Sequence, residues 1–113
     1  MANTFKLKNN AVMPSSTGTP DTLYTVPSST TTVVLGLVLC NVHSANVTAT
    51  VTVTDNESSD VVSYLIKDTP IPVGSSLEVM AGNKLILEAT DIIKIDCSVA
   101  DKISPTMSIM EIT

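Results

Sequence analysis

VTATVTVT, at residues 47–54, is the clearest strand signal in the chain, because threonine alternates strictly in it with valine or alanine. Successive side chains of a β-strand point to opposite faces of the sheet. The stretch therefore predicts a strand that buries its aliphatic residues on one face and presents threonine on the other. The chain has 113 residues, which is enough for one hydrophobic core and too few for two.

Segments of similar character occur on both sides of this stretch, with turn signals about every 8–12 residues and no sustained helical period. The sequence therefore predicts an all-β fold: a single β-sandwich of seven or eight strands, jelly-roll-like or immunoglobulin-like, over residues 21–113. Besides residues 47–54, the expected strands lie at residues 22–26, 31–42, 62–66, 77–79, 85–87, 93–99 and 106–112.

Two hairpins and one bulge are expected within this sandwich. The turn residues around Gly82 favour a hairpin between the two short strands that flank them. Residues 101–105 favour a second hairpin, between the last two expected strands. Gly36 interrupts a long apolar run, where glycine marks a bulge or the close approach of another backbone.

Residues 1–20 differ from the rest and predict an extended N-terminal arm. Asn, Ser, Pro and Gly punctuate them, and no regular period is sustained. Within the arm, Phe5 and Leu7 alternate with Lys6 and Lys8, a pattern that suits a short strand added to the sheet edge of a neighbouring protein. We therefore identify these four residues as the candidate partner contact.

Composition limits the classes of partner. A formal net charge of −5 disfavours non-specific nucleic-acid binding, which requires lysine and arginine against the phosphates. No run approaches the roughly 18–20 apolar residues that cross a bilayer. The first residues lack the apolar stretch of a secretion signal, so we expect synthesis in a cytoplasm, with Cys40 and Cys97 reduced. A disulfide between them remains the alternative.

Catalytic and metal-binding patterns are weak, and we expect neither an enzyme nor a cofactor. The single histidine, His43, follows the long apolar run, and no G-x-S-x-G motif accompanies it. The acidic loop at residues 55–60 lacks the spacing of a calcium loop, so we predict a solvated loop and no metal site.

The predicted outer surface is dominated by Thr and Ser. Only 15% of the residues are charged, so the sheet edges lack the charges that ordinarily prevent association. Such a surface is suited to burial against other proteins or between copies, and we expect a homo-oligomer, with a trimer as one possible state.

Several short segments between residues 23 and 113 carry a resemblance to a known family. They are LYTVP at 23–27, VLGL at 34–37, NV at 41–42, YLIKDTPIP at 64–72, GSSLEV at 74–79, KLILE at 84–88 and MSIMEIT at 107–113. In content and order they resemble a family of small virion structural proteins of tailed bacteriophages, especially those of marine cyanobacterial phages.

The resemblance implies a non-enzymatic particle component that binds the major capsid protein or other virion proteins. A head decoration or cement protein is the leading expectation, and a collar, neck or tail ring component is the alternative. A third hypothesis, from another class, is a carbohydrate-binding domain of a fibre. The sequence speaks against it, because it has no Trp and because Tyr24 and Tyr64 lie within strand patterns.

Overall fold

The computed structural model describes residues 2–56 and 59–113, which form nine β-strands in two antiparallel sheets. The strands are β1 (Asn3–Asn9), β2 (Asp21–Thr25), β3 (Thr31–Asn41), β4 (Val47–Asp55), β5 (Val61–Ile71), β6 (Ser76–Glu78), β7 (Leu85–Leu87), β8 (Ile92–Cys97) and β9 (Ile103–Ile112). None of the described residues forms a helix of the length and apolar character that a membrane span requires.

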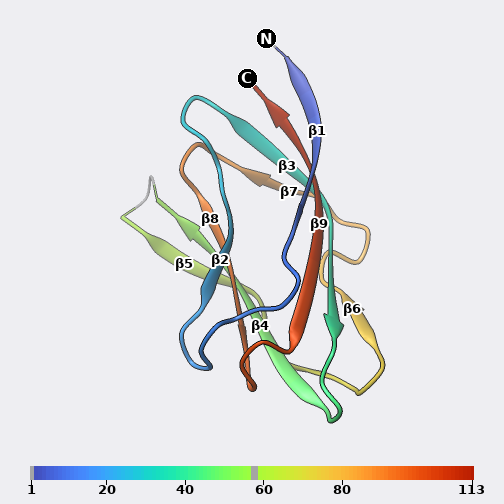
Figure 1. The fold of residues 1–113 in the computed structure, drawn as a ribbon. Coiled ribbons are helices and arrows are strands. Elements are labelled where there is room, and N and C mark those ends of the chain that lie inside the picture. Colours follow the sequence, from blue (N-terminus) through green and yellow to red (C-terminus); the bar gives the residue numbers. More distant parts are fainter. Residues whose placement is uncertain (1, 57–58) are drawn as a thin grey trace.

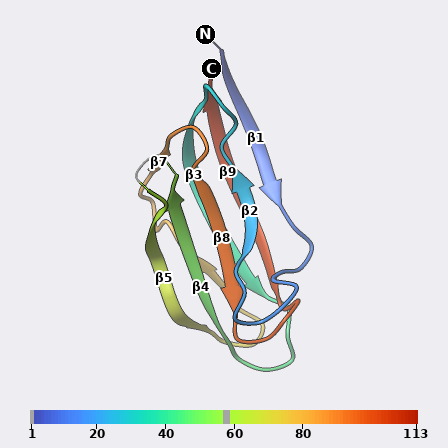
Figure 2. The ribbon, with the colours of Figure 1, turned by 90° about the vertical axis from the view of Figure 1, so that its left-hand side faces the viewer.

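The two sheets face each other as the layers of a sandwich (Figure 1). The first sheet has the order β1-β9-β3-β6, and β7 also pairs with β3; we call it sheet A. The second has the order β2-β8-β4-β5; we call it sheet B. Figure 2 shows β1 along the outer margin of the molecule, beside β9.

The predicted all-β sandwich is confirmed, with nine strands in the described residues rather than seven or eight. The eight expected segments correspond to β2 through β9. The additional strand is β1, which contains the four residues predicted as the partner contact. It pairs with β9 of its own chain, in unbroken register from Asn3 opposite Ile112 to Asn9 opposite Thr106.

Both predicted hairpins are wrong, because turn residues locate a change of direction without specifying the next neighbour. β6 and β7 do not pair with each other: β6 lies against Val38–Cys40 and β7 against Thr32–Val34, so both continue along β3. β8 and β9 lie in different sheets, and the turn between them carries the chain across the sandwich. The predicted bulge is confirmed, since the β3–β9 register shifts between Val34 and Gly36.

The core lies between the sheets and is built almost entirely from aliphatic side chains. Alternation places Ala49 and Val51 of β4 on the inner face of sheet B, fully buried as predicted. Burial of each large side chain contributes roughly 1.5–3 kcal/mol. The largest buried aliphatic side chains from strands are Leu37, Leu39, Ile71, Leu87, Ile93, Ile95, Ile103, Met107 and Ile109.

The segment between β1 and β2 closes one end of the sandwich. Met13 is only 2% exposed, and its backbone exchanges two hydrogen bonds with Ile103, of 2.8 and 3.1 Å. Nearby, the Asp101 N–H donates to the carbonyl of Pro14 at 2.7 Å, and the Thr17 hydroxyl donates to the carbonyl of Cys97 at 2.8 Å. Residues predicted as an arm therefore contribute a core side chain.

We predict that Met13→Ala lowers the free energy of unfolding by about 2–4 kcal/mol, because the substitution leaves a cavity in the core. Its neighbour Val12, which is 40% exposed, supplies the matched control: Val12→Ala should change stability by less than about 0.5 kcal/mol. Urea denaturation of the full chain measures both. Equal small effects would contradict a core role for this segment.

Candidate docking surface

β1 is an edge strand, and half of its backbone groups point away from the sheet. Ala2 and Thr113 exchange two backbone hydrogen bonds, of 3.1 and 2.9 Å. In an antiparallel pair such bonds recur at every second residue. Hence Thr4, Lys6 and Lys8 bond to β9, whereas the N–H and C=O groups of residues 3, 5, 7 and 9 face the free edge.

The two lysines of β1 turn inward. Lys6 lies opposite Ile109 and Lys8 opposite Met107, both of which are fully buried in the core. Lys6 Nζ lies 2.8 Å from Glu111 Oε1, and Lys8 Nζ lies 5.7 Å from the centroid of the Tyr24 ring. Lysines on an edge strand ordinarily discourage pairing with other chains. Here both ammonium groups lie on the inner-face side of β1 and are engaged by groups of the chain itself, although the Lys6 side chain is still 44% exposed; the outer face of β1 carries no charged side chain.

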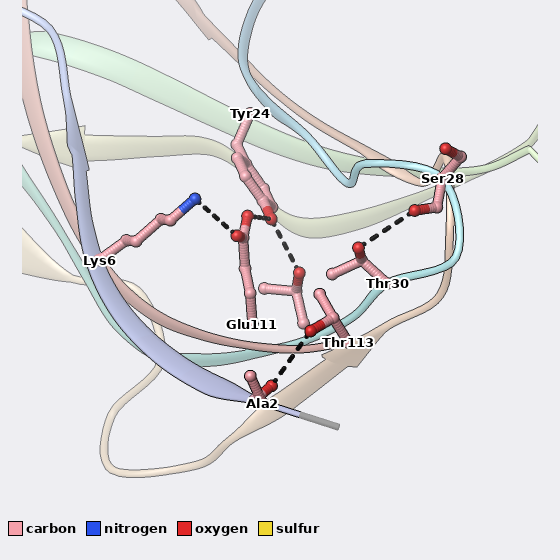
Figure 3. Close-up of polar contacts among 8 residues, drawn as sticks. Ala2, Lys6, Tyr24, Ser28, Thr30, Glu111 and Thr113 are labelled. Atoms are coloured by element: carbon pink, nitrogen blue, oxygen red, sulfur yellow. Dashed lines mark hydrogen bonds and ion pairs between the residues drawn. The ribbon is translucent and has the colours of Figure 1, made fainter.

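A buried polar network around Glu111 holds the lysine in place (Figure 3). The Tyr24 hydroxyl donates to Glu111 Oε2 at 2.6 Å and also lies 2.8 Å from Thr32 Oγ1. The side chains come from both sheets: Tyr24 from β2, Thr32 from β3, Glu111 from β9 and Lys6 from β1. A buried carboxylate is costly unless it is paired and hydrogen-bonded, and this network provides both.

The same contacts shift the pKa values of Glu111 and Tyr24. Hydrogen bonds from Lys6 and then from Tyr24 hold the pKa of Glu111 below its ordinary value of 4.5. Burial raises the pKa of Tyr24 to about 12, and its hydrogen bond to the Glu111 carboxylate acts in the same direction. At neutral pH the network therefore contains the Glu111 carboxylate and the neutral phenol of Tyr24.

The outer face of sheet A carries an apolar row that is exposed at its two ends, while Val33 in its middle is only 9% exposed. Register aligns Phe5 of β1, Met110 of β9, Val33 of β3 and Ile86 of β7 across four strands. Phe5 is 72% exposed, and Ile86 is similarly open to solvent. Leu7, 59% exposed, lies beside this row on β1. We call Phe5, Leu7, Val33, Ile86 and Met110 the outer apolar row.

The face around this row is nearly uncharged. Among the described strand residues that register places on it, Glu78 is the only charged one. Its Oε1 accepts hydrogen bonds from the N–H groups of Leu37 and Met80, at 3.3 and 3.1 Å. Because the carboxylate is already occupied, the face can meet another protein without displacing a free charge.

The structure divides the four predicted contact residues into two pairs. Phe5 and Leu7 lie on the outer face with their backbone groups at the free edge, whereas Lys6 and Lys8 lie on the inner face. The sequence grouped them because it shows alternation without showing which set faces the core. The remainder of the outer apolar row was missed, since its members come from strands far apart in the chain.

The other residues singled out in the sequence lie outside this surface. His43 lies in the loop between β3 and β4, where its N–H donates to Asn41 Oδ1 at 2.8 Å. Cys40 and Cys97 are free cysteines on β3 and β8, in different sheets.

An acidic cluster lies at the C-terminal end of β4. Carboxylate oxygens of Asp55, Glu88 and Asp91 all lie within 4.8 Å of one another. Asp91 is buried and accepts hydrogen bonds from the N–H groups of Glu88 and Asn56, at 2.9 and 3.2 Å, so it fastens two loops. Two residues of the predicted acidic loop, Glu57 and Ser58, lie outside the described residues.

We predict that Glu111→Gln lowers the free energy of unfolding by about 1–3 kcal/mol at neutral pH, because the ion pair with Lys6 is lost. The pKa of Glu111 is lower in the folded protein than in the unfolded chain, so the Glu111 carboxylate stabilises the fold at pH values above its unfolded pKa. This stabilisation is lost as the pH falls through the pKa of Glu111 in the folded protein. The difference between wild type and variant should therefore shrink below about pH 4.5. Urea denaturation at a series of pH values measures it, and a constant difference would contradict the network.

No family model matches the chain, and no curated protein matches it in sequence. The structure is similar to a chain of the acid-stable capsid structure of Helicobacter pylori bacteriophage KHP30, with a TM-score of 0.54 and 10% identity over 97% of this chain and 90% of that one. A chain in the structure of infectious bursal disease virus, Gt strain, has a TM-score of 0.39 and 12% identity, over 98% of this chain and 30% of that one. At such low identity, the likeness to the phage capsid chain shows a shared fold.

Proposed function

We propose that this chain is a non-enzymatic virion structural protein that docks on a phage head as a decoration or cement protein. The observation that carries the proposal is the free edge of β1, where unpaired backbone groups lie beside the exposed side chains of Phe5 and Leu7. Two further observations support it: the sequence resembles small virion proteins of tailed phages, and the fold resembles a chain of a phage capsid structure.

The edge offers a simple means of attachment. The outward N–H and C=O groups of residues 3, 5 and 7 can bond to a strand of the partner, which then extends sheet A by one strand. Burial of Phe5 and Leu7 against the partner contributes roughly 1.5–3 kcal/mol each before the costs of association. Contacts of this strength suit a protein displayed in many copies, because occupancy is reinforced wherever neighbouring copies also touch.

The partner is the major capsid protein or another protein of the virion. Of the four residues predicted as the contact, we propose that Phe5 and Leu7 meet the partner and that Lys6 and Lys8 hold β1 in register from inside. The nearly uncharged outer face of sheet A is the surface that would bring copies of the chain together as a homo-oligomer.

The same surface would serve a collar, neck or tail ring component, which is the alternative. The number of copies per particle distinguishes the two positions. Hundreds of copies would indicate the head shell, whereas about a dozen would indicate a ring. Quantitative mass spectrometry of purified virions measures this number.

We predict that the double substitution Phe5→Ser with Leu7→Ser reduces attachment to particles that lack the protein by about tenfold or more, since the loss of two apolar contacts exceeds 1.4 kcal/mol. Val61→Ser supplies the control, because Val61 is 54% exposed on the opposite sheet and should tolerate the change. Circular dichroism must show that both variants fold. Wild-type attachment by the folded double variant would contradict docking through β1.

Leu7→Pro tests the backbone contribution separately. The N–H of Leu7 faces the free edge, so proline removes a donor from the docking edge and leaves the β1–β9 bonds intact. We expect a folded variant with weakened attachment. Lys8→Pro, which removes an N–H that bonds to β9, should instead lower stability. Equal effects of the two substitutions on stability would contradict the assigned register.

A further inference from the structure

A groove with a volume of about 340 Å³ lies on the outer face of sheet B, and threonines of β4 form its floor. This volume is near the lower end of ligand pockets, which span roughly 300–1,000 Å³. Thr52 is the central floor residue, with Tyr64 of β5 opposite it on one side and Lys94 of β8 on the other. The alternation that buries valine in the core thus aligns threonine in a groove between two rows of larger side chains.

The Thr52 hydroxyl is available to a ligand. Thr52 is only 6% exposed, yet its side chain makes no hydrogen bond to any described residue. No fully buried side-chain oxygen or nitrogen in the described residues lacks a partner, so this hydroxyl must reach solvent through the groove. Thr50, in contrast, is already engaged, because its Oγ1 accepts a hydrogen bond of 3.0 Å from the Asp68 N–H.

The walls combine one aromatic ring with charged groups. Tyr64 is 56% exposed, and Lys67 Nζ lies 5.2 Å from the centroid of its ring. On the opposite wall, Asp96 stands beside Lys94, and its Oδ1 accepts hydrogen bonds from the N–H groups of Gly18 and Cys97, at 3.1 and 2.9 Å. The carboxylate is thereby fixed at the rim, and the loop before β2 is held against the groove.

The groove is less acidic than the chain as a whole. Two of the six lysines, Lys67 and Lys94, line it together with the carboxylate of Asp96, and Asp68 Oδ1 lies 3.5 Å from Oγ1 of the floor residue Thr50. The chain as a whole carries a net charge of −5. A ligand with an anionic group is therefore favoured at this position over the rest of the surface.

We infer that this groove binds an acidic saccharide, a sugar carrying a carboxylate or a comparable anionic group. Lys67 lies over one face of the Tyr64 ring, and the rest of the exposed ring offers apolar surface to the C–H groups of a sugar ring. Thr52 offers a hydroxyl, and Lys94 offers an ammonium group to the anion. The groove lies on the sheet opposite the outer apolar row, so a chain docked through β1 leaves it open. The inference goes beyond the virion role and does not depend on it.

The saccharide hypothesis was disfavoured in the sequence because both tyrosines lie in strand patterns. The structure separates them: Tyr24 is buried in the polar network, whereas Tyr64 lies on the outer face of an edge strand. The groove therefore combines an exposed aromatic ring with a few placed polar groups, a combination typical of small-ligand sites.

Titration of the full chain with oligogalacturonate, followed by NMR chemical shifts, tests the inference. We expect saturable binding at roughly millimolar or lower concentration, with shifts centred on Thr52, Tyr64 and Lys94. The methyl-esterified oligomer is the matched neutral probe and should bind about tenfold more weakly, since it has lost the charged contact. Absence of binding to the acidic oligomer, or equal binding of the ester, would overturn the assignment.

Three variants locate the site. Thr52→Val replaces the hydroxyl with a methyl group of similar size, so it should preserve stability and weaken binding severalfold. Lys94→Met should weaken binding by about tenfold, whereas Lys84→Met, which removes a lysine outside the groove, should leave it unchanged. Unaltered binding by both Thr52→Val and Lys94→Met would show that the saccharide does not occupy this groove.

Discussion

The contact between Lys6 and Glu111 is the constraint on which the docking edge depends. Glu111 is buried, and its charge is tolerated only because Lys6 and Tyr24 reach it from two other strands. A slip of β1 by one residue would move the lysines outward and bring Phe5 and Leu7 against the network. The ion pair therefore favours the observed register, which the backbone ladder with β9 also holds, and the register decides which side chains and which backbone groups stand at the free edge.

Much of the fold could be predicted because alternation reports directly on burial. The VTATVTVT stretch gave the correct strand, and the glycine within the long apolar run marked a true bulge. Pairing partners could not be predicted in the same way, because a period of two distinguishes the faces of a strand without identifying its neighbours. For this reason the sequence did not show that the strands around Gly82 both pair with β3, or that the last two strands belong to different sheets.

The candidate sites show the same division. Alternation at residues 5–8 indicated a strand with two unlike faces, and only the β1–β9 register shows that the lysines face inward. The groove depends on Thr52, Tyr64 and Lys94, which lie on three adjacent strands and have no sequence spacing that would connect them. Asp55 and Asp91 are likewise brought together by strand pairing, because β4 and β8 pair beside them. Outer and inner faces thus carry separate tasks: aliphatic residues close the core, while the two outer faces present an apolar row and a polar groove.

Amide hydrogen exchange along β1 tests the central claim most directly, because it reads the orientation of each N–H. We expect slow exchange at Lys6 and Lys8, which bond to β9, and fast exchange at Phe5 and Leu7, which face the free edge. Attachment to particles should then protect Phe5 and Leu7. Uniformly fast exchange in the free protein would mean that β1 is not held by its own sheet, and uniformly slow exchange would mean that the edge is already covered. Either result would be incompatible with docking through a free β1 edge.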